Sequence, residues 1–167
     1  MTAVAMLREG LVKLLRAGGM TAIEAFPASE RKRWEKPLLV VSVKEFVAKE
    51  PGIGSYLGER WKEETQSLEE VYGQWVSIRI SLDIYVPNSE GEAGLGETVD
   101  RVCELFSATT PMGLSVLELK FGETKYERSC DMLKKQGSLS CEGLMYALRK
   151  EDGSFTDFEV RGGITLA

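Results

Sequence analysis

The stretch Trp-Val-Ser-Ile-Arg-Ile-Ser-Leu-Asp-Ile-Tyr-Val, residues 75–86, decides the fold class of this chain. Its apolar residues occupy alternate positions, which places them on one side of an extended strand; they are Val76, Ile78, Ile80, Leu82, Ile84 and Val86. The other side carries Ser77, Arg79, Ser81 and Asp83. We therefore predict a long strand with one buried face and one wetter face, which ends at Pro87 because proline cannot donate a ladder hydrogen bond.

The residues before this strand predict a helix and two more strands. Residues 2–17 place leucines at helical spacing, with Thr2 as the N-cap and Gly18-Gly19 as the stop. Residues 20–26 have short strand character and stop at Pro27. Residues 38–47 are almost continuously apolar, which predicts an inner strand covered on both faces. A turn is expected at residues 51–54, and strand character from Ser67 onward.

The residues after the strand predict a second helix and further strands. A loop at residues 91–96 leads to a helix over residues 98–108. This helix carries an apolar stripe that Leu95 can extend toward the N-terminus. Pro111 and Gly113 end it, and residues 114–121 alternate as a strand. Residues 125–135 fit either one helical turn or a strand. Residues 138–149 and 155–166 flank Asp152-Gly153, a strong hairpin signal.

These elements together predict an α+β fold. We expect a mixed, mostly antiparallel sheet of about 4–6 strands with two main helices packed on it. A length of 167 residues fits one domain, residues 1–167.

The composition argues against several classes of function. The chain contains no histidine, which excludes Ser-His-Asp and Cys-His catalysis and zinc sites that use imidazole. Its net charge is −5, and its basic residues are scattered except at residues 31–33, so we expect no nucleic-acid partner. No apolar run approaches the roughly 20 residues that span a bilayer, and the first ten residues do not resemble a secretory signal.

The three cysteines predict a reducing compartment. Cys103, Cys130 and Cys141 are odd in number and follow no tight metal-ligand spacing. We expect three free, buried thiols and no disulfide.

Three groups of residues could in principle bind a ligand or act in catalysis, and for each group a structural role is favoured. The glycines of residues 91–96 lie between a strand and a helix, but they match neither G-x-G-x-x-G nor the Walker pattern. The adjacent pairs Glu63-Glu64 and Glu69-Glu70 indicate a solvated charged segment. Asp100 and Glu104 share a helix face without a third ligand, so we expect no metal, no cofactor and no catalytic residue.

Residues 56–70, called the arm below, carry the candidate interface. Large apolar groups stand here among seven charged residues without the periodicity needed to bury themselves in their own domain. Aromatic anchors inside a charged rim are the usual anatomy of an interface. We predict an oligomer interface formed by Tyr56, Leu57, Trp61 and Leu68. For Trp34, Trp61 and Trp75, each near a loop or strand end, a half-buried position at the core edge is the default expectation, and anchoring of an interface is the alternative.

The order of elements resembles the tail terminator family of tailed bacteriophages and prophages, also called tail-completion or minor tail proteins. The likeness rests on the N-terminal helix, the strand at residues 38–43, the irregular arm with Tyr56-Leu57-Gly58-Glu59, the strand ending at Pro87, the glycine-bearing loop and the following helix. It covers about two thirds of the chain, from the N-terminus to Phe106.

The resemblance implies a structural protein rather than an enzyme. Several copies, usually six, would form a ring that caps the tail tube and offers a surface to the head connector. The protein would then belong to the virion tail, with assembly in the cytoplasm of the bacterial host. The alternatives are another head–tail connector or tail tube subunit, or a small-ligand-binding or enzymatic α+β domain that uses the Gly91–Gly96 loop.

Overall fold

The computed structural model describes residues 3–24, 34–49, 56–149 and 155–161. Its elements follow one another along the chain as α1 (Ala3–Ala17), β1 (Ala22–Glu24), β2 (Leu38–Lys49), β3 (Tyr56–Lys62), β4 (Ser67–Pro87), α2 (Gly91–Ala108), the 3-10 turn η2 (Pro111–Gly113), β5 (Ser115–Glu127), β6 (Met132–Arg149) and β7 (Phe155–Arg161). The α+β prediction is confirmed.

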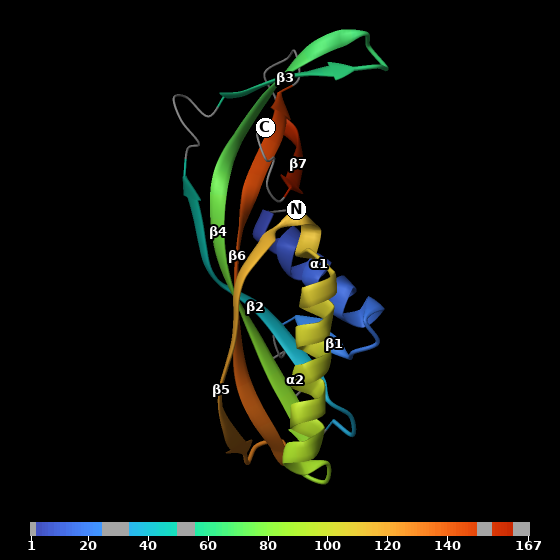
Figure 1. The fold of residues 1–167 in the computed structure, drawn as a ribbon, viewed down its shortest axis with the longest axis vertical. Coiled ribbons are helices and arrows are strands. Elements are labelled where there is room, and N and C mark those ends of the chain that lie inside the picture. Colours follow the sequence, from blue (N-terminus) through green and yellow to red (C-terminus); the bar gives the residue numbers. More distant parts are fainter. Residues whose placement is uncertain (1–2, 25–33, 50–55, 150–154, 162–167) are drawn as a thin grey trace.

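One mixed sheet forms the body of the molecule. Within the described residues it has seven strands, in the order β1-β2-β4-β6-β5, with β3 added beside β4 and β7 beside β6. The β1–β2 pair is parallel and the other pairs are antiparallel, so the sheet is mostly antiparallel as predicted. Both helices lie on the same side of the sheet (Figure 1).

The main core lies between the helices and the sheet. The predicted strand at residues 75–86 is the second half of β4, and its alternating apolar residues are all buried there. Opposite them lie buried residues of α1 and α2, namely Leu7, Leu11, Leu15, Leu95, Val102 and Phe106. Arg79 is exposed and Asp83 is partly exposed, as predicted. β4 ends at Pro87 and begins at Ser67, which confirms the predicted strand character from Ser67.

A second, smaller core covers one end of the other sheet face. Leu38, Val40, Tyr85, Cys130 and Met132 are buried together there, with Trp34 packed against them. The inner strand predicted at residues 38–47 is covered on both faces only over its first four residues, where Leu39 and Val41 belong to the main core. The rest of β2 is half-buried or exposed.

The predicted loop at residues 91–96 is wrong, because these residues form the first turns of α2. Leu95 is fully buried and continues the apolar stripe of the helix. A Cβ built at Gly94 would come within 2.7 Å of the Glu90 side chain and within 3.2 Å of a Val86 methyl group. Close packing against Glu90 and the end of β4 thus explains the glycine.

The ambiguous residues 125–135 form the β5–β6 hairpin, with the turn at residues 128–131. β6 and β7 pair as an antiparallel hairpin, as predicted, although the Asp152-Gly153 turn lies outside the described residues. So do the expected N-cap Thr2, the stop at Pro27 and the turn at residues 51–54.

The cysteines differ in part from the expectation. All three are free, and Cys130 and Cys141 are buried, but Cys103 is exposed on α2. Among the described residues, no helix has both the length and the apolar character required to cross a membrane.

Candidate docking site

The arm is a β-hairpin that extends beyond the helices at one end of the molecule (Figure 1). β3 pairs with the first residues of β4 from Tyr56↔Tyr72 to Lys62↔Ser67, and residues 63–66 form the turn. Gln66 takes a positive φ of 49° to close it. The irregular segment of the sequence is therefore an ordered extension of the sheet, because β4 runs without interruption from the arm into the core.

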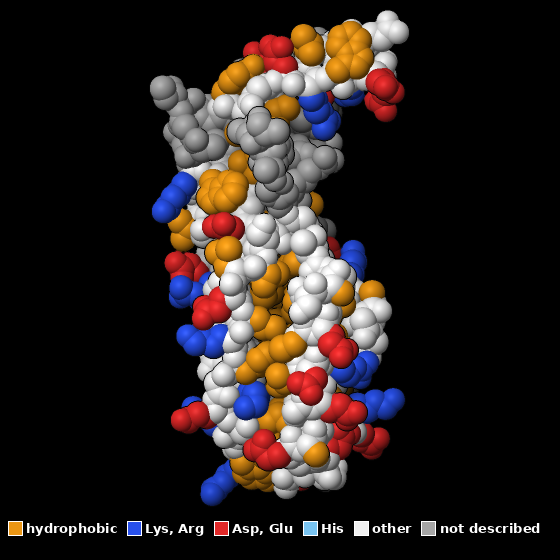
Figure 2. All heavy atoms as spheres, in the orientation of Figure 1, with side chains coloured by type: hydrophobic (Ala, Val, Ile, Leu, Met, Phe, Trp, Pro, Cys, Tyr) orange, Lys and Arg blue, Asp and Glu red, His pale blue; other side chains and the backbone are white. Residues whose placement is uncertain are grey.

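The register divides the arm into two faces with different chemistry. Residues directly opposite each other in an antiparallel pair lie on the same face. Trp61 pairs with Leu68 and Glu59 pairs with Glu70, so one face combines large apolar groups with carboxylates. We call it the acidic-aromatic face; it consists of Tyr56, Glu59, Trp61, Leu68 and Glu70. Figure 2 shows hydrophobic and acidic side chains together on the arm.

The acidic-aromatic face is open to solvent. Trp61 is 59% exposed and Leu68 is 60% exposed, and Tyr56 is exposed beside them. The ring of Tyr56 stands edge-on to that of Tyr72, with the centroids 5.7 Å apart. Reduced hydration raises the pKa of Tyr56, and the negative charges of Glu59 and Glu70 add to this rise. Both carboxylates therefore act on the same aromatic surface.

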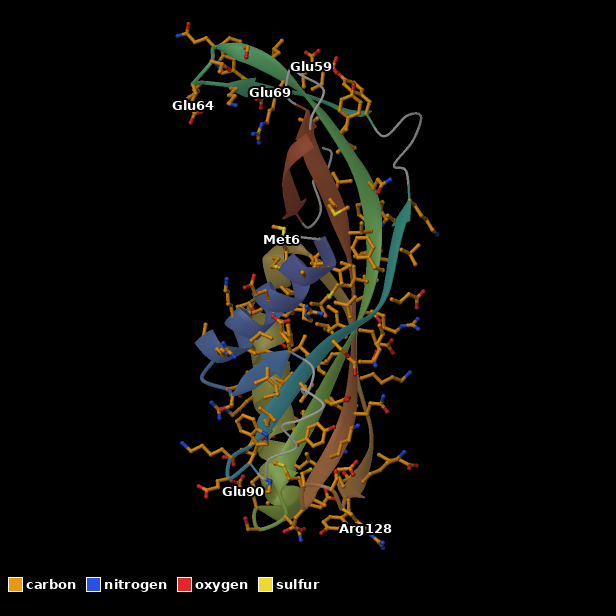
Figure 3. The ribbon with its side chains drawn as sticks, turned by 180° about the vertical axis from the view of Figure 1, so that it is seen from behind. Met6, Glu59, Glu64, Glu69, Glu90 and Arg128 are labelled. Atoms are coloured by element: carbon orange, nitrogen blue, oxygen red, sulfur yellow. The ribbon has the colours of Figure 1, made fainter. Side chains whose placement is uncertain are left out.

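The opposite face of the arm pairs two cations with one carboxylate. The Glu69 carboxylate lies 3.0 Å from the Lys62 ammonium and 3.4 Å from Arg60 Nε. The hydrogen bond from Lys62 holds the pKa of Glu69 below its usual value, and the same bond raises the pKa of Lys62. In Figure 3, Glu59, Glu64 and Glu69 mark the arm, far from Met6 on α1.

The acidic-aromatic face continues the core side of the sheet past the point where the helices end. Leu68 and Glu70 are even-numbered positions of β4, like Ile78 and Ile80, and alternation places all of them on one side of the strand. Near the helices this side is buried, and on the arm it is exposed. The arm thus presents a surface that in the body of the sheet is covered by protein.

The predicted interface residues fall in two groups. Tyr56, Trp61 and Leu68 come together on the acidic-aromatic face. Leu57 is half-buried at the bulge between Tyr56 and Gly58, and it has no partner position in the register. Composition does not show that Glu59 and Glu70 lie opposite each other, but a hairpin register counted back from the turn at residues 63–66 indicates it. Of the other tryptophans, Trp75 is 36% exposed and Trp34 packs on the second core.

A second exposed surface lies on the sheet face that points away from the helices, called the bare sheet face below. A hollow of about 130 Å³ opens there, lined chiefly by Glu45, Ser77, Arg79, Leu117 and Ser140. Leu117 is the extra residue of a bulge in β5 and is 59% exposed. Arg79 Nη1 lies 3.1 Å from the Glu45 carboxylate, and both side chains are largely exposed. We call this site the Arg79–Leu117 hollow.

The residues of α2 that the sequence offered as possible ligand or metal sites lie separately along the helix. The glycines of residues 91–96 lie inside α2, and the N–H of Gly94 donates to the Glu90 carbonyl at 3.2 Å. Asp100 and Glu104 border a shallow surface depression on α2. Across the described ranges, no three Cys, Asp or Glu side chains are grouped as metal ligands would be.

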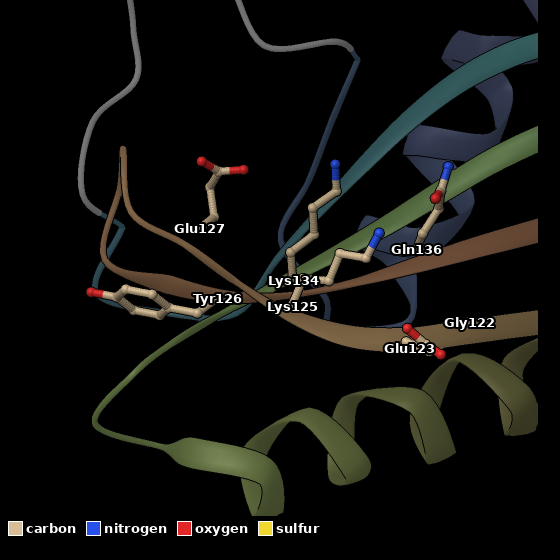
Figure 4. A pocket seen from close by; sticks show the side chains of 7 residues that line it. All are labelled: Gly122, Glu123, Lys125, Tyr126, Glu127, Lys134 and Gln136. Carbon is tan, nitrogen blue, oxygen red and sulfur yellow. The ribbon is translucent and has the colours of Figure 1, made fainter.

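A larger cavity of about 390 Å³ lies at the β5–β6 hairpin (Figure 4). Lys125 and Lys134 line it from neighbouring positions of the two strands. Lys134 Nζ lies 3.6 Å from the Asp83 carboxylate and 5.4 Å from the centre of the Tyr85 ring. These contacts tie Lys134 to β4 and indicate a structural role.

Comparison with known proteins shows a likeness to solved structures. No protein-family model and no curated protein sequence matches the chain. Among solved structures, the chain is similar to the sheath/tube terminator of an extracellular contractile injection system, PVC, in its extended state. The sequences are 11% identical and the TM-score is 0.43, over 100% of this chain and 62% of that chain. This chain therefore spans less than two thirds of the length of that terminator.

Proposed function

We propose that this protein is a structural, ring-forming tail terminator, in which the arm of each copy packs against a neighbouring subunit. The observation that carries the proposal is the arm itself. It is an ordered hairpin that extends past the helices and exposes Tyr56, Trp61 and Leu68 on one face. The order of elements, which resembles the tail terminator family, supports the same function.

In this proposal six copies form the ring, cap the tail tube and offer a surface to the head connector. A ring needs two different complementary surfaces on each subunit, because its contacts run head to tail and close by rotation. An exposed hairpin at one end of an elongated subunit supplies one of them (Figure 1). Ring formation on a finished tube would place the protein in the virion tail.

The test uses a phage that assembles with this protein. Trp61→Ala and Leu68→Ala remove the exposed anchors without opening the core, so the protein should fold and accumulate normally. We expect tails longer than normal, or tails that fail to join heads. Met6→Ala, an exposed apolar residue on α1, is the control and should leave tails unchanged. Infectious particles with tails of normal length in both arm variants would contradict the proposal.

A further inference from the structure

We propose that the acidic-aromatic face of the arm docks on the bare sheet face of a second copy of this chain, at the Arg79–Leu117 hollow. The inference rests on the proposed ring and names the surface on which each arm lands. In this inference Glu59 and Glu70 bind Arg79 of the second copy. Leu68 and Trp61 pack into the hollow and against its rim.

The charge pattern of the arm favours a cation from outside the arm. Glu70 accepts a hydrogen bond from the Tyr72 hydroxyl at 2.6 Å, but this neutral donor leaves the negative charge in place. Glu59 and Glu70 stand directly opposite each other, and like charges in that position destabilise a strand pair. Both cations of the arm, Arg60 and Lys62, lie on its other face and contact Glu69. A guanidinium from a partner would bind both carboxylates at once, because its planar fork offers several donors.

The Arg79–Leu117 hollow offers that cation beside an apolar group. The Arg79 side chain is 59% exposed, and its present partner Glu45 is 50% exposed. An exposed ion pair of this kind contributes little, so Arg79 can exchange Glu45 for the arm at small cost. The bulge in β5 raises Leu117 next to it. The hollow, about 130 Å³, is smaller than the roughly 300–1,000 Å³ of ligand pockets and suits a single apolar side chain such as Leu68.

The contact must form between two copies. Glu70 and Arg79 are nine positions apart on the same continuous strand and point to opposite faces of it. At about 3.3 Å per residue they are separated by roughly 30 Å within one chain. An arm therefore cannot reach its own hollow. Because the two surfaces differ, each copy would use one of each, which is the arrangement that closes a ring.

Cysteine cross-linking between two differently marked proteins tests the contact. Both proteins carry Cys103→Ser, which removes the exposed native thiol. One also carries Leu68→Cys and the other Leu117→Cys, and they are mixed at high concentration and oxidised. We expect a covalent dimer in the mixture, little in either protein alone, and a ladder of oligomers when both cysteines are in one chain. Tyr126→Cys, 51% exposed on β5, replaces Leu117→Cys in the control and should give no dimer above background.

Charge reversal then tests the assigned chemistry. An arm protein with Glu59→Arg and Glu70→Arg should lose about tenfold in cross-linking yield against the native hollow. A partner with Arg79→Glu should lose as much against the native arm, and the two reversed proteins together should recover most of the yield. Glu64→Arg with Lys120→Glu, a reversed pair outside the proposed contact, is the control and should change little.

The outcomes separate this inference from the terminator proposal. The inference is overturned if Leu68→Cys joins Tyr126→Cys as well as it joins Leu117→Cys, if the reversed proteins do not recover, or if concentrated protein shows no such dimer. If tails still fail in the Trp61→Ala phage, the terminator proposal stands and the arm docks on another protein. If tails are normal in both the Trp61→Ala and the Leu68→Ala phage, the terminator proposal itself fails.

Discussion

At the scale of single residues, Ile80 shows how strongly the alternating pattern determines burial. It is fully enclosed between the sheet and the helices, and Ser81 beside it points to the other face, where its hydroxyl lies 3.1 Å from the Asp83 carboxylate. We predict that Ile80→Ala lowers the free energy of unfolding by about 2–5 kcal/mol, through lost burial and the cavity left behind. Chemical denaturation of the two variants measures it. Ser81→Ala should cost only about 0.5–1.5 kcal/mol, and equal losses would contradict the assignment.

The thiols give a second prediction at this scale. Burial raises the pKa of Cys141 to about 11, whereas Cys103 is exposed on α2. Since the thiolate is the reactive form, Cys103 should be alkylated at pH 8 in the folded protein, and Cys141 only after denaturation. Mass spectrometry of peptides from native and unfolded samples measures both sites. A mass two protons low without reduction would indicate a disulfide, against the three free thiols of the structure.

At the scale of elements, the two faces of the arm predict opposite effects of the same chemical change. Glu59→Gln removes the repulsion from Glu70 across the hairpin, so the amide protection of the arm should rise. Glu69→Gln removes the contacts to Lys62 and Arg60, so the protection should fall. Hydrogen exchange followed by mass spectrometry measures both, and changes of the same sign would show that the register does not control arm stability.

The same element has a pH dependence of known sign. The pKa of Glu69 is lowered in the folded arm below its ordinary value of 4.5. A lowered pKa means that the contribution of this carboxylate is fully present above the unfolded pKa and is lost as the pH falls through the folded one. The effect of Glu69→Gln on arm protection should therefore shrink as the pH falls below 4.5.

An element is predicted well from the sequence when residues with a clear structural preference stand at its two ends. β4 is predicted well because its core half alternates without exception and Pro87 ends it. The start of α2 is not predicted, because Gly91, Gly94 and Gly96 are poor helix formers. Close packing accounts for Gly94 and a positive φ of 61° for Gly91, and neither is visible in the sequence. The β5–β6 turn is also not predicted, because its sequence contains no glycine or proline. Asp131 supplies the positive φ of 52° there.

The acidic-aromatic face was predictable only in part, because the sequence does not show how the two strands of the arm are paired. Composition identifies Trp61 and Leu68 as apolar groups without a place in the core. The faces they share with Glu59 and Glu70 depend on the register, which is a relation between two strands. Arg79 and Leu117 are farther still from sequence reasoning, because three strands and a bulge bring them to one hollow.

At the scale of the whole molecule, the core lies in the body of the sheet and helices, and the proposed assembly contacts lie on the arm. The two core clusters of the described residues include no residue of the arm. We predict that replacing residues 59–70 by a two-residue Asn-Gly turn leaves the cooperative unfolding of the body within a few degrees of the wild type, while tail completion is lost. Thermal melts followed by circular dichroism, together with electron microscopy of tails, test this. Loss of the cooperative transition would show that the arm belongs to the folding unit.

Because β4 is continuous, the number of its residues sets how far the arm extends from the core. The strand has 21 residues, so it spans roughly 70 Å at about 3.3 Å per residue, and no hinge separates its two ends. Adding one residue between core and arm would turn every side chain of the arm to the other side. Adding two, matched in β6, would keep each side chain on its side and move the tip outward by roughly 7 Å. The reach of the arm can therefore change only in even steps of two residues, as in a gauge with a fixed pitch.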